Sequence, residues 1–382
     1  MQFVDLASQR ERIKKPLEAA IAKVIAEGRY IHGPEVAEFE KALADYVGVE
    51  HVVACANGTD ALLVPLMALG IGPGDAVFCP SFTFAATAEV VVLAGAEPVF
   101  VDIDPVSYNM SPQSLEAAID HVNRAGLLNP KAIIPVDLFG LSADYGALQA
   151  IAERAGLTII EDAAQSIGGQ FANHRCGAFG DVAGTSFYPA KPLGCYGDGG
   201  AMLTNDAALA EILRSIAFHG KGKSQYDNVR IGLNSRLDTL QAAILIQKLT
   251  ILPDEMDRRQ AVAERYNALL GDVVKTPVVP SGFRSAWAQY TIKSDRRDDI
   301  RTHLTASGIP SMVYYEKPLH LQPAYDSFER SPTGLAASEA ASRSVLCLPM
   351  HPYLGEADQS RIAGAVREAV AARDTPVAAA VP

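Results

Sequence analysis

The hydrophobic residues follow two different patterns along the chain, which has 382 residues. Near the N-terminus, apolar residues recur every three to four positions and predict helices over 10–27 and from Pro34 to about Val47. From His51 onward, short apolar runs alternate with helical segments. Such alternation is typical of a mainly parallel sheet flanked by helices. The runs that predict strands are 51–55, 76–79, 98–101, 132–136, 158–161 and 182–185.

The pattern changes in the last third of the chain. A helix with a buried stripe that includes Leu237 and Ile244 should break at Pro253, and another helix should follow to Leu270. The segment 271–282 is predicted to be a linker. Beyond it the alternation resumes and predicts a smaller α/β unit. Its expected elements are strands over 287–293 and 310–315 and helices over 298–307 and 355–372.

Composition narrows the classes of function. The net charge of −11 and the pI of about 5.2 argue against a nucleic-acid partner. The five cysteines are odd in number and form no CxxC pair, so we expect neither a disulfide framework nor a zinc site. The N-terminus lacks an apolar signal core, and no apolar run has membrane-spanning length. We therefore expect a cytoplasmic protein without a membrane partner.

Ligands of parallel sheets bind at the carboxyl ends of the strands, so the residues that follow each run are candidates for a site. After the first run, Gly58 and Thr59 lie in a turn that feeds a helix, whose free N–H groups suit a phosphate. An ordinary strand-to-helix turn is the alternative. After the second run come Phe82 and Phe84, of which one can lie flat against a cofactor ring while the other belongs to the core.

Two polar residues follow the fifth run. Asp162 lies at the end of an apolar strand, and Gln165 follows three residues later. A carboxylate at this place can pair with a protonated pyridine nitrogen, the partner that pyridoxal phosphate (PLP) needs to act as an electron sink. The alternative is a helix N-cap aspartate.

One lysine, Lys191, is predicted to lie in a short loop between a strand and a glycine-rich turn. Pro192 follows it and disfavours helix at the lysine. A lysine amine in such irregular backbone can form a Schiff base with PLP, whereas a surface-loop lysine is the alternative. Ser186 lies five residues earlier, and its hydroxyl is a candidate donor to a cofactor phosphate. Asn234 and Arg236 lie at the mouth of the helix predicted after them.

These residues together carry a resemblance to a known family. The constellation of Asp162, Gln165, Ser186, Lys191 and Asn234 resembles that of the nucleotide-sugar aminotransferases of the DegT/DnrJ/EryC1/StrS family. The resemblance runs nearly end to end, from FVDLASQR to LPMHPYL. The motifs CANGTDAL, EDAAQS, KPLGCYGDGGA and NSRLDTLQAAIL most resemble those of enzymes that aminate C3 of UDP-linked 3-oxo sugars, notably UDP-2-acetamido-2-deoxy-3-oxo-glucuronate.

The resemblance implies the type I aminotransferase fold and a PLP-dependent transaminase. The large PLP-binding domain would span 1–250, with an N-terminal helical segment and a mainly parallel seven-stranded sheet between helices. A small C-terminal α/β domain would span 251–382. The implied reaction is a ping-pong transfer of an amino group from L-glutamate to C3 of the sugar, for the biosynthesis of lipopolysaccharide, O-antigen or lipid A sugars. The implied active unit is a homodimer with shared active sites.

The resemblance also implies a role for each candidate residue. Lys191 matches the Schiff-base lysine, which also moves the proton to the substrate carbon. Asp162 matches the carboxylate on the pyridine nitrogen, and Gln165 the amide near the ring hydroxyl. The remaining cofactor-binding positions are matched by Gly58, Thr59 and Ser186 at the phosphate, by Phe84 on the ring and by Asn234 from the other subunit. Arg236 matches a position that reaches the substrate across the interface.

The chain departs from the uronate-specific enzymes at one place. In those enzymes a His-Tyr pair follows the valine that is Val313 here, whereas this chain has Tyr314 and Tyr315 at these substrate-binding positions. A tyrosine can donate a hydrogen bond to a carboxylate but offers no positive charge. UDP-3-oxo-N-acetylglucosamine and a dTDP-3-oxo-6-deoxyhexose are therefore competing substrates.

Three other classes of protein are alternatives to the aminotransferase. A PLP-dependent sugar dehydratase (a lyase) is similar in sequence but has histidine where Lys191 stands. A non-catalytic regulator with the same fold would have lost part of the constellation, which is complete here. A NAD-dependent enzyme is disfavoured because no GxGxxG follows an early strand.

Overall fold

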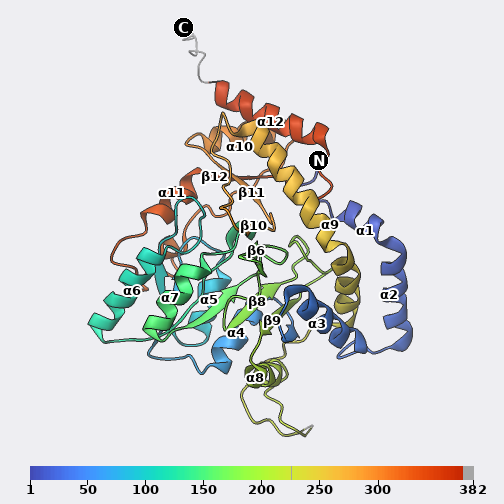
Figure 1. Ribbon diagram of the computed structural model, residues 1–382, viewed down its shortest axis with the longest axis vertical. Helices are drawn as coiled ribbons and strands as arrows, with labels where there is room; N and C mark the ends of the chain where they lie inside the picture. Colours follow the sequence, from blue (N-terminus) through green and yellow to red (C-terminus); the bar gives the residue numbers. More distant parts are fainter. Residues whose placement is uncertain (225, 373–382) are drawn as a thin grey trace.

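A seven-stranded sheet lies at the centre of the computed structural model, which describes residues 1–224 and 226–372 (Figure 1). In the order in which they pair, its strands are β1 (His51–Cys55), β9 (Gly200–Thr204), β8 (Val182–Ser186), β5 (Thr158–Asp162), β4 (Asn129–Ile133), β2 (Asp75–Pro80) and β3 (Glu97–Val101). The pairs from β8 to β3 are parallel, and β9 runs antiparallel to both of its neighbours. The predicted mainly parallel seven-stranded sheet is therefore confirmed.

Helices cover both faces of this sheet. Because side chains alternate along a strand, Val77 and Cys79 of β2 face one helical layer, whereas Ala76 and Phe78 face the other. The first layer contains α4 (Gly58–Ala68), α5 (Ala86–Leu93) and α8 (Ala207–Ala217). The second contains α3 (Pro34–Val47), α6 (Pro112–Ala125) and α7 (Tyr145–Ala155). The outcome is a three-layer α/β arrangement in which the loops after all strands except the antiparallel β9 lie at one edge of the sheet.

The longest helix, α9 (Thr239–Leu270), corrects one prediction. A break was expected at Pro253, but the helix continues through it. The proline removes one backbone donor, yet Leu249, Leu252 and Met256 on both sides of it are buried in one core, so tertiary packing maintains the helix. The N-terminal α1 (Leu6–Arg12) and α2 (Lys14–Glu27) lie beside α9 (Figure 1).

The C-terminal part forms a second core. Strand β11 (Tyr290–Lys293) pairs antiparallel with β12 (Val345–Leu348), and α10 (Arg297–Ala306), α12 (Glu356–Ala371) and the end of α9 pack on this pair. The predicted strand over 310–315 is wrong: only Met312 forms a bridge, with Cys347. Pro310 has no backbone N–H to donate to a neighbouring strand. Tyr314 and Tyr315 pack with an aromatic cluster outside the sheet.

The remaining elements are short. They are the three-stranded sheet of β10 (Phe283–Arg284), β6 (Gln170–Phe171) and β7 (His174–Arg175), the single turns η1 (Leu138–Gly140) and η2 (Leu319–Leu321), and α11 (Ala336–Ser344). In the described part of the chain, no helix is both long and apolar enough to cross a membrane.

The predicted boundary between residues 250 and 251 falls inside α9. Met256 packs with the core of the large sheet, whereas Val262 packs with the C-terminal core, so one helix serves both. The division into domains stays a prediction, and residues 373–382 of the predicted small domain lie outside the described residues.

Candidate active site

A buried carboxylate lies at the end of β5. Asp162 is 5% exposed; its Oδ2 accepts a hydrogen bond from Thr87 Oγ1 at 2.9 Å, and its Oδ1 accepts one from the Ala164 N–H at 3.2 Å. Burial raises the pKa of Asp162, and the bond from Thr87, the bond from Ala164 and the charge of Lys191 oppose this rise. The structure therefore brings Asp162 and Lys191 close enough to interact electrostatically.

Lys191 is partly buried in the turn after β8. Its backbone N–H donates to the carbonyl of Tyr188 at 2.9 Å, but among the described residues nothing accepts a hydrogen bond from its Nζ. Burial lowers the pKa of Lys191, and the charge of Asp162 opposes this fall. A lysine with a lowered pKa and no partner is an amine available for covalent chemistry.

The first turn of α4 meets the end of β8 at a glycine. A Cβ at Gly58 would lie 2.6 Å from Cβ and 3.0 Å from Oγ of Ser186, so only glycine permits this approach. The Asn57 side chain caps the helix by accepting from the Asp60 N–H at 2.8 Å.

The amides next to this cap are available as donors. The N–H groups of Gly58 and Thr59 have no acceptor among the described residues, and the Ser186 hydroxyl lies against Gly58. The positive end of the α4 dipole adds to these donors. They form a cradle suited to a phosphate.

The amide of Gln165 is fixed in orientation by two hydrogen bonds. Its Oε1 accepts from the Phe139 N–H at 2.8 Å, and its Nε2 donates to Tyr315 Oη at 3.3 Å. Gln165 is buried and stands three residues after Asp162, so one turn carries both polar groups. The contact also links Tyr315, a predicted substrate residue, to a predicted cofactor residue.

The two phenylalanines after β2 have different surroundings. Phe82 is fully buried, whereas Phe84 is 59% exposed. The Tyr315 ring lies 6.0 Å from the Phe82 centroid and 6.4 Å from that of Phe84, and 5.7 Å from that of Tyr314. Phe84 is therefore the ring that is free to cover a cofactor, and Tyr314 lies in the same aromatic group.

The side chains of Asn234 and Arg236 contact each other and, in the described part of the chain, make no hydrogen bond to the other candidates. Arg236 Nη2 donates to Asn234 Oδ1 at 2.5 Å, and its guanidinium lies 5.0 Å from the centroid of the Phe218 ring. Within residues 1–224 and 226–372, no hydrogen bond or ion pair joins either residue to Lys191 or Asp162. One chain alone does not bring these two residues to the lysine by direct contact.

Sequence reasoning missed Thr87. This buried residue of α5 donates to Asp162 and lies 3.2 Å, hydroxyl to hydroxyl, from Thr83. The spacing of the two threonines, one helical turn apart, was a possible signal, but it does not indicate which strand end they face.

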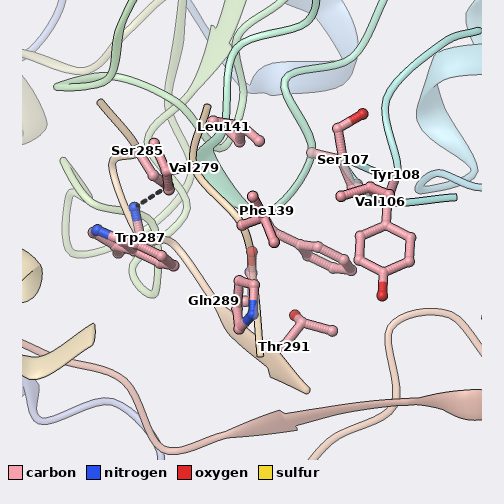
Figure 2. A pocket seen from close by; sticks show the side chains of 13 residues that line it. Val106, Ser107, Tyr108, Phe139, Leu141, Val279, Ser285, Trp287, Gln289 and Thr291 are labelled. Atoms are coloured by element: carbon pink, nitrogen blue, oxygen red, sulfur yellow. Dashed lines mark hydrogen bonds between the residues drawn. The ribbon is translucent and has the colours of Figure 1, made fainter. Parts of the chain in front are cut away.

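A small cavity lies beside η1, the turn in which the Phe139 N–H donates to Gln165 (Figure 2). Its volume is about 30 Å³, and Figure 2 shows Tyr108, Phe139 and Trp287 among its lining residues. Since a buried water needs at least about 10–15 Å³ of such volume, the cavity is far too small for a nucleotide sugar.

The site has the chemistry of a PLP enzyme. Lys191 can form the Schiff base, Asp162 can hold a protonated ring nitrogen, and the donors around Gly58 can bind the phosphate. The Lys191 amine, which has no hydrogen-bond partner in the part of the chain that the structure describes, and the closely packed cradle both fit this cofactor.

Comparison with known proteins agrees with this class. The model of the DegT/DnrJ/EryC1/StrS aminotransferase family matches residues 11–367, and the chain belongs to this family. It is 49% identical to a UDP-2-acetamido-2-deoxy-3-oxo-D-glucuronate aminotransferase of Pseudomonas aeruginosa, over 96% of this chain and 99% of that protein. It is 40% identical to a UDP-N-acetyl-3-dehydro-alpha-D-glucosamine 3-aminotransferase of Acidithiobacillus ferrooxidans, over 96% of each chain.

A solved structure gives the same result. The crystal structure of a DegT DnrJ EryC1 StrS aminotransferase from Brucella abortus matches with a TM-score of 0.95 and 67% identity, over 96% of this chain and 98% of that one. The predicted fold, the PLP dependence and the transaminase class are therefore confirmed.

Proposed function

We propose that this enzyme transfers an amino group from L-glutamate to C3 of a UDP-linked 3-oxo sugar. The observation that carries the proposal is the amine of Lys191, which has no hydrogen-bond partner among the described residues and interacts electrostatically with the buried carboxylate of Asp162. The sugar class is supported by the two relatives, both of which are named for UDP-linked 3-oxo or 3-dehydro sugars. The product would serve the biosynthesis of lipopolysaccharide, O-antigen or lipid A sugars in the cytoplasm.

The cofactor would lie between β5, β8 and the start of α4. Its ring supplies the electron sink for the carbon that loses or gains a proton. Asp162 would keep the ring nitrogen protonated, while Gln165 would lie near the ring hydroxyl and Phe84 would cover the ring. The phosphate would be bound by Gly58, Thr59 and Ser186, to which the other subunit would add Asn234.

Lys191 would act twice. Its amine would first bind the cofactor covalently and then, displaced by the amine of the substrate, would move a proton at the substrate carbon. Because burial lowers its pKa, a larger fraction of this amine is neutral and able to accept that proton.

Two UDP-linked sugars satisfy the proposal, and they differ at C6. Tyr314 and Tyr315 can donate hydrogen bonds to a C6 hydroxyl or carboxylate, but neither supplies a positive charge. A charge from Arg236 of a second subunit would favour the uronate. The sugar is therefore UDP-2-acetamido-2-deoxy-3-oxo-D-glucuronate or UDP-3-oxo-N-acetylglucosamine, and a dTDP-3-oxo-6-deoxyhexose is the alternative.

Absorbance in the visible range tests the reaction. The protein with bound PLP should be yellow, L-glutamate should bleach it, and the correct 3-oxo sugar should restore the colour. Adding each of the three sugars to the bleached protein then identifies the substrate. A colour that glutamate leaves unchanged contradicts the donor, and a colour restored only by the dTDP sugar contradicts the UDP assignment.

The homodimer with shared sites has its own test. In mixtures of Lys191→Ala and Arg236→Ala subunits, a mixed dimer would contain one site with both residues intact. If the two variants pair at random, about a quarter of the sites should be functional although each variant alone is inactive. A mixture as inactive as its parents would contradict the sharing.

A further inference from the structure

Two polar residues of α9, the half-buried Gln241 and the buried Lys248, face the segment that follows Lys191. Gln241 and Lys248 stand seven residues apart, two helical turns, and so lie on one face of the helix. Lys248 is 1% exposed, which is rare for a lysine, because a buried ammonium needs partners to offset its lost hydration. The groups that Lys248 contacts therefore indicate its role.

Both residues contact the backbone of the Lys191 segment. Lys248 Nζ donates to the carbonyl of Gly194 at 2.6 Å and lies 4.2 Å from the centroid of the Tyr196 ring. Gln241 Oε1 accepts from the Tyr196 N–H at 2.8 Å. The helix thus binds this segment at two points, three and five residues after Lys191.

The segment between these points and Lys191 is tightly folded. A Cβ at Gly194 would lie 2.5 Å from the carbonyl oxygen of Pro189 and 2.7 Å from that of Tyr188. The Cys195 N–H donates to the Phe187 carbonyl at 2.7 Å, and the Lys191 N–H donates to the Tyr188 carbonyl. Because the turn closes on itself, a displacement of Gly194 is transmitted to Lys191.

The charges around Lys248 offer it no ion pair among the described residues. Burial lowers its pKa to about 8, and the charges of Glu255 and Cys195 oppose this fall. Glu255 accepts hydrogen bonds from Gln9 and Tyr353, so its carboxylate is already engaged. The Gly194 carbonyl is therefore the hydrogen-bond acceptor that the structure gives to the Lys248 ammonium.

We propose that Lys248 and Gln241 are positioning residues that fix the Lys191 turn in the geometry from which Lys191 reacts. The proposal rests on the proposed role of Lys191 as the Schiff-base lysine. It assigns α9 an indirect role, because both side chains act through the backbone of Gly194 and Tyr196.

The test compares four variants with wild-type protein, all loaded with PLP. Lys248→Met removes the donor, Gln241→Met removes the acceptor, and Lys248→Arg restores a donor. The control is Tyr290→Phe, which removes a hydrogen bond to Asn267 on the same helix, far from the Lys191 turn. The readouts are the pH midpoint of the visible absorbance, the rate of bleaching by saturating L-glutamate, and the melting temperature.

Lys248→Met and Gln241→Met should bleach about tenfold to a hundredfold more slowly, because small misplacements of reacting groups cost that much. Their pH midpoints should move, Lys248→Arg should recover part of the rate, and Tyr290→Phe should only lower the melting temperature. If Lys248→Met does not fold, Gln241→Met decides, since it leaves the buried charge in place. The positioning role is overturned if the methionine variants keep the wild-type rate and midpoint. A wild-type protein without visible absorbance refutes the proposed function itself.

Discussion

Replacing Gly58 by alanine should weaken PLP binding without unfolding the protein. The new Cβ would lie 2.6 Å from Cβ of Ser186, where ordinary contacts begin at 3.4 Å. Gly58 does not have a positive φ, so the cost is steric and does not come from the backbone conformation. The protein without cofactor can relax by moving the first turn of α4 away from β8. Binding the PLP phosphate requires the first turn of α4 to return to its position against β8.

The magnitude follows from the overlap. Overpacking a close contact costs about 1–3 kcal/mol, and if this cost falls on the cofactor-bound state, the dissociation constant of PLP rises about 5- to 150-fold. The assay is an equilibrium titration of the protein with PLP, followed by absorbance. The matched control is Gly72→Ala, whose Cβ would come no closer than 3.5 Å to its neighbours. A Gly58→Ala protein that binds PLP within about twofold of wild type would refute the assigned cradle.

Two further predictions concern buried polar groups. Thr87→Val removes the hydroxyl that donates to Asp162, and a hydrogen bond to a charged group is worth about 1.5–3 kcal/mol, so kcat should fall about tenfold to a hundredfold, with recovery in Thr87→Ser. Unchanged turnover of Thr87→Val would contradict this role. Burial lowers the pKa of His351 from its ordinary 6.5 to about 4, so as the pH falls through this window the unfolded chain takes up a proton that the folded chain does not. The free energy of unfolding by urea should therefore decrease from pH 6.5 towards pH 4, and His351→Gln should make that decrease smaller; an equal decrease in both proteins would show that His351 is not its cause.

The placement of Asp162 and Ser186 at one edge of the sheet could be predicted from the sequence because parallel strands end at a common edge. Asp162 and Ser186 each follow an apolar run directly, so their convergence needs only the sheet. The bond from Thr87 to Asp162 could not be predicted in this way, since it depends on the order of β2, β4 and β5 in the sheet. That order comes from tertiary packing, which local patterns do not encode.

Tertiary packing also explains the errors of secondary structure. Pro253 is a helix breaker by its own chemistry, but the buried residues on both sides of it maintain α9. The continuous helix joins the face that contacts the Lys191 turn to the C-terminal core. The sequence at Tyr314 and Tyr315 has the composition of a strand, yet the aromatic cluster around Phe82 takes these side chains out of the sheet.

The most direct test of the account is to locate the lysine that binds the cofactor. The wild-type protein with PLP is reduced with borohydride, which makes a Schiff base permanent, and its peptides are analysed by mass spectrometry. The account predicts one modified site, Lys191, and no stable adduct in Lys191→Ala protein with an unchanged melting temperature. An adduct on another lysine, or a Lys191→Ala protein that still transfers amino groups, would contradict the central claim.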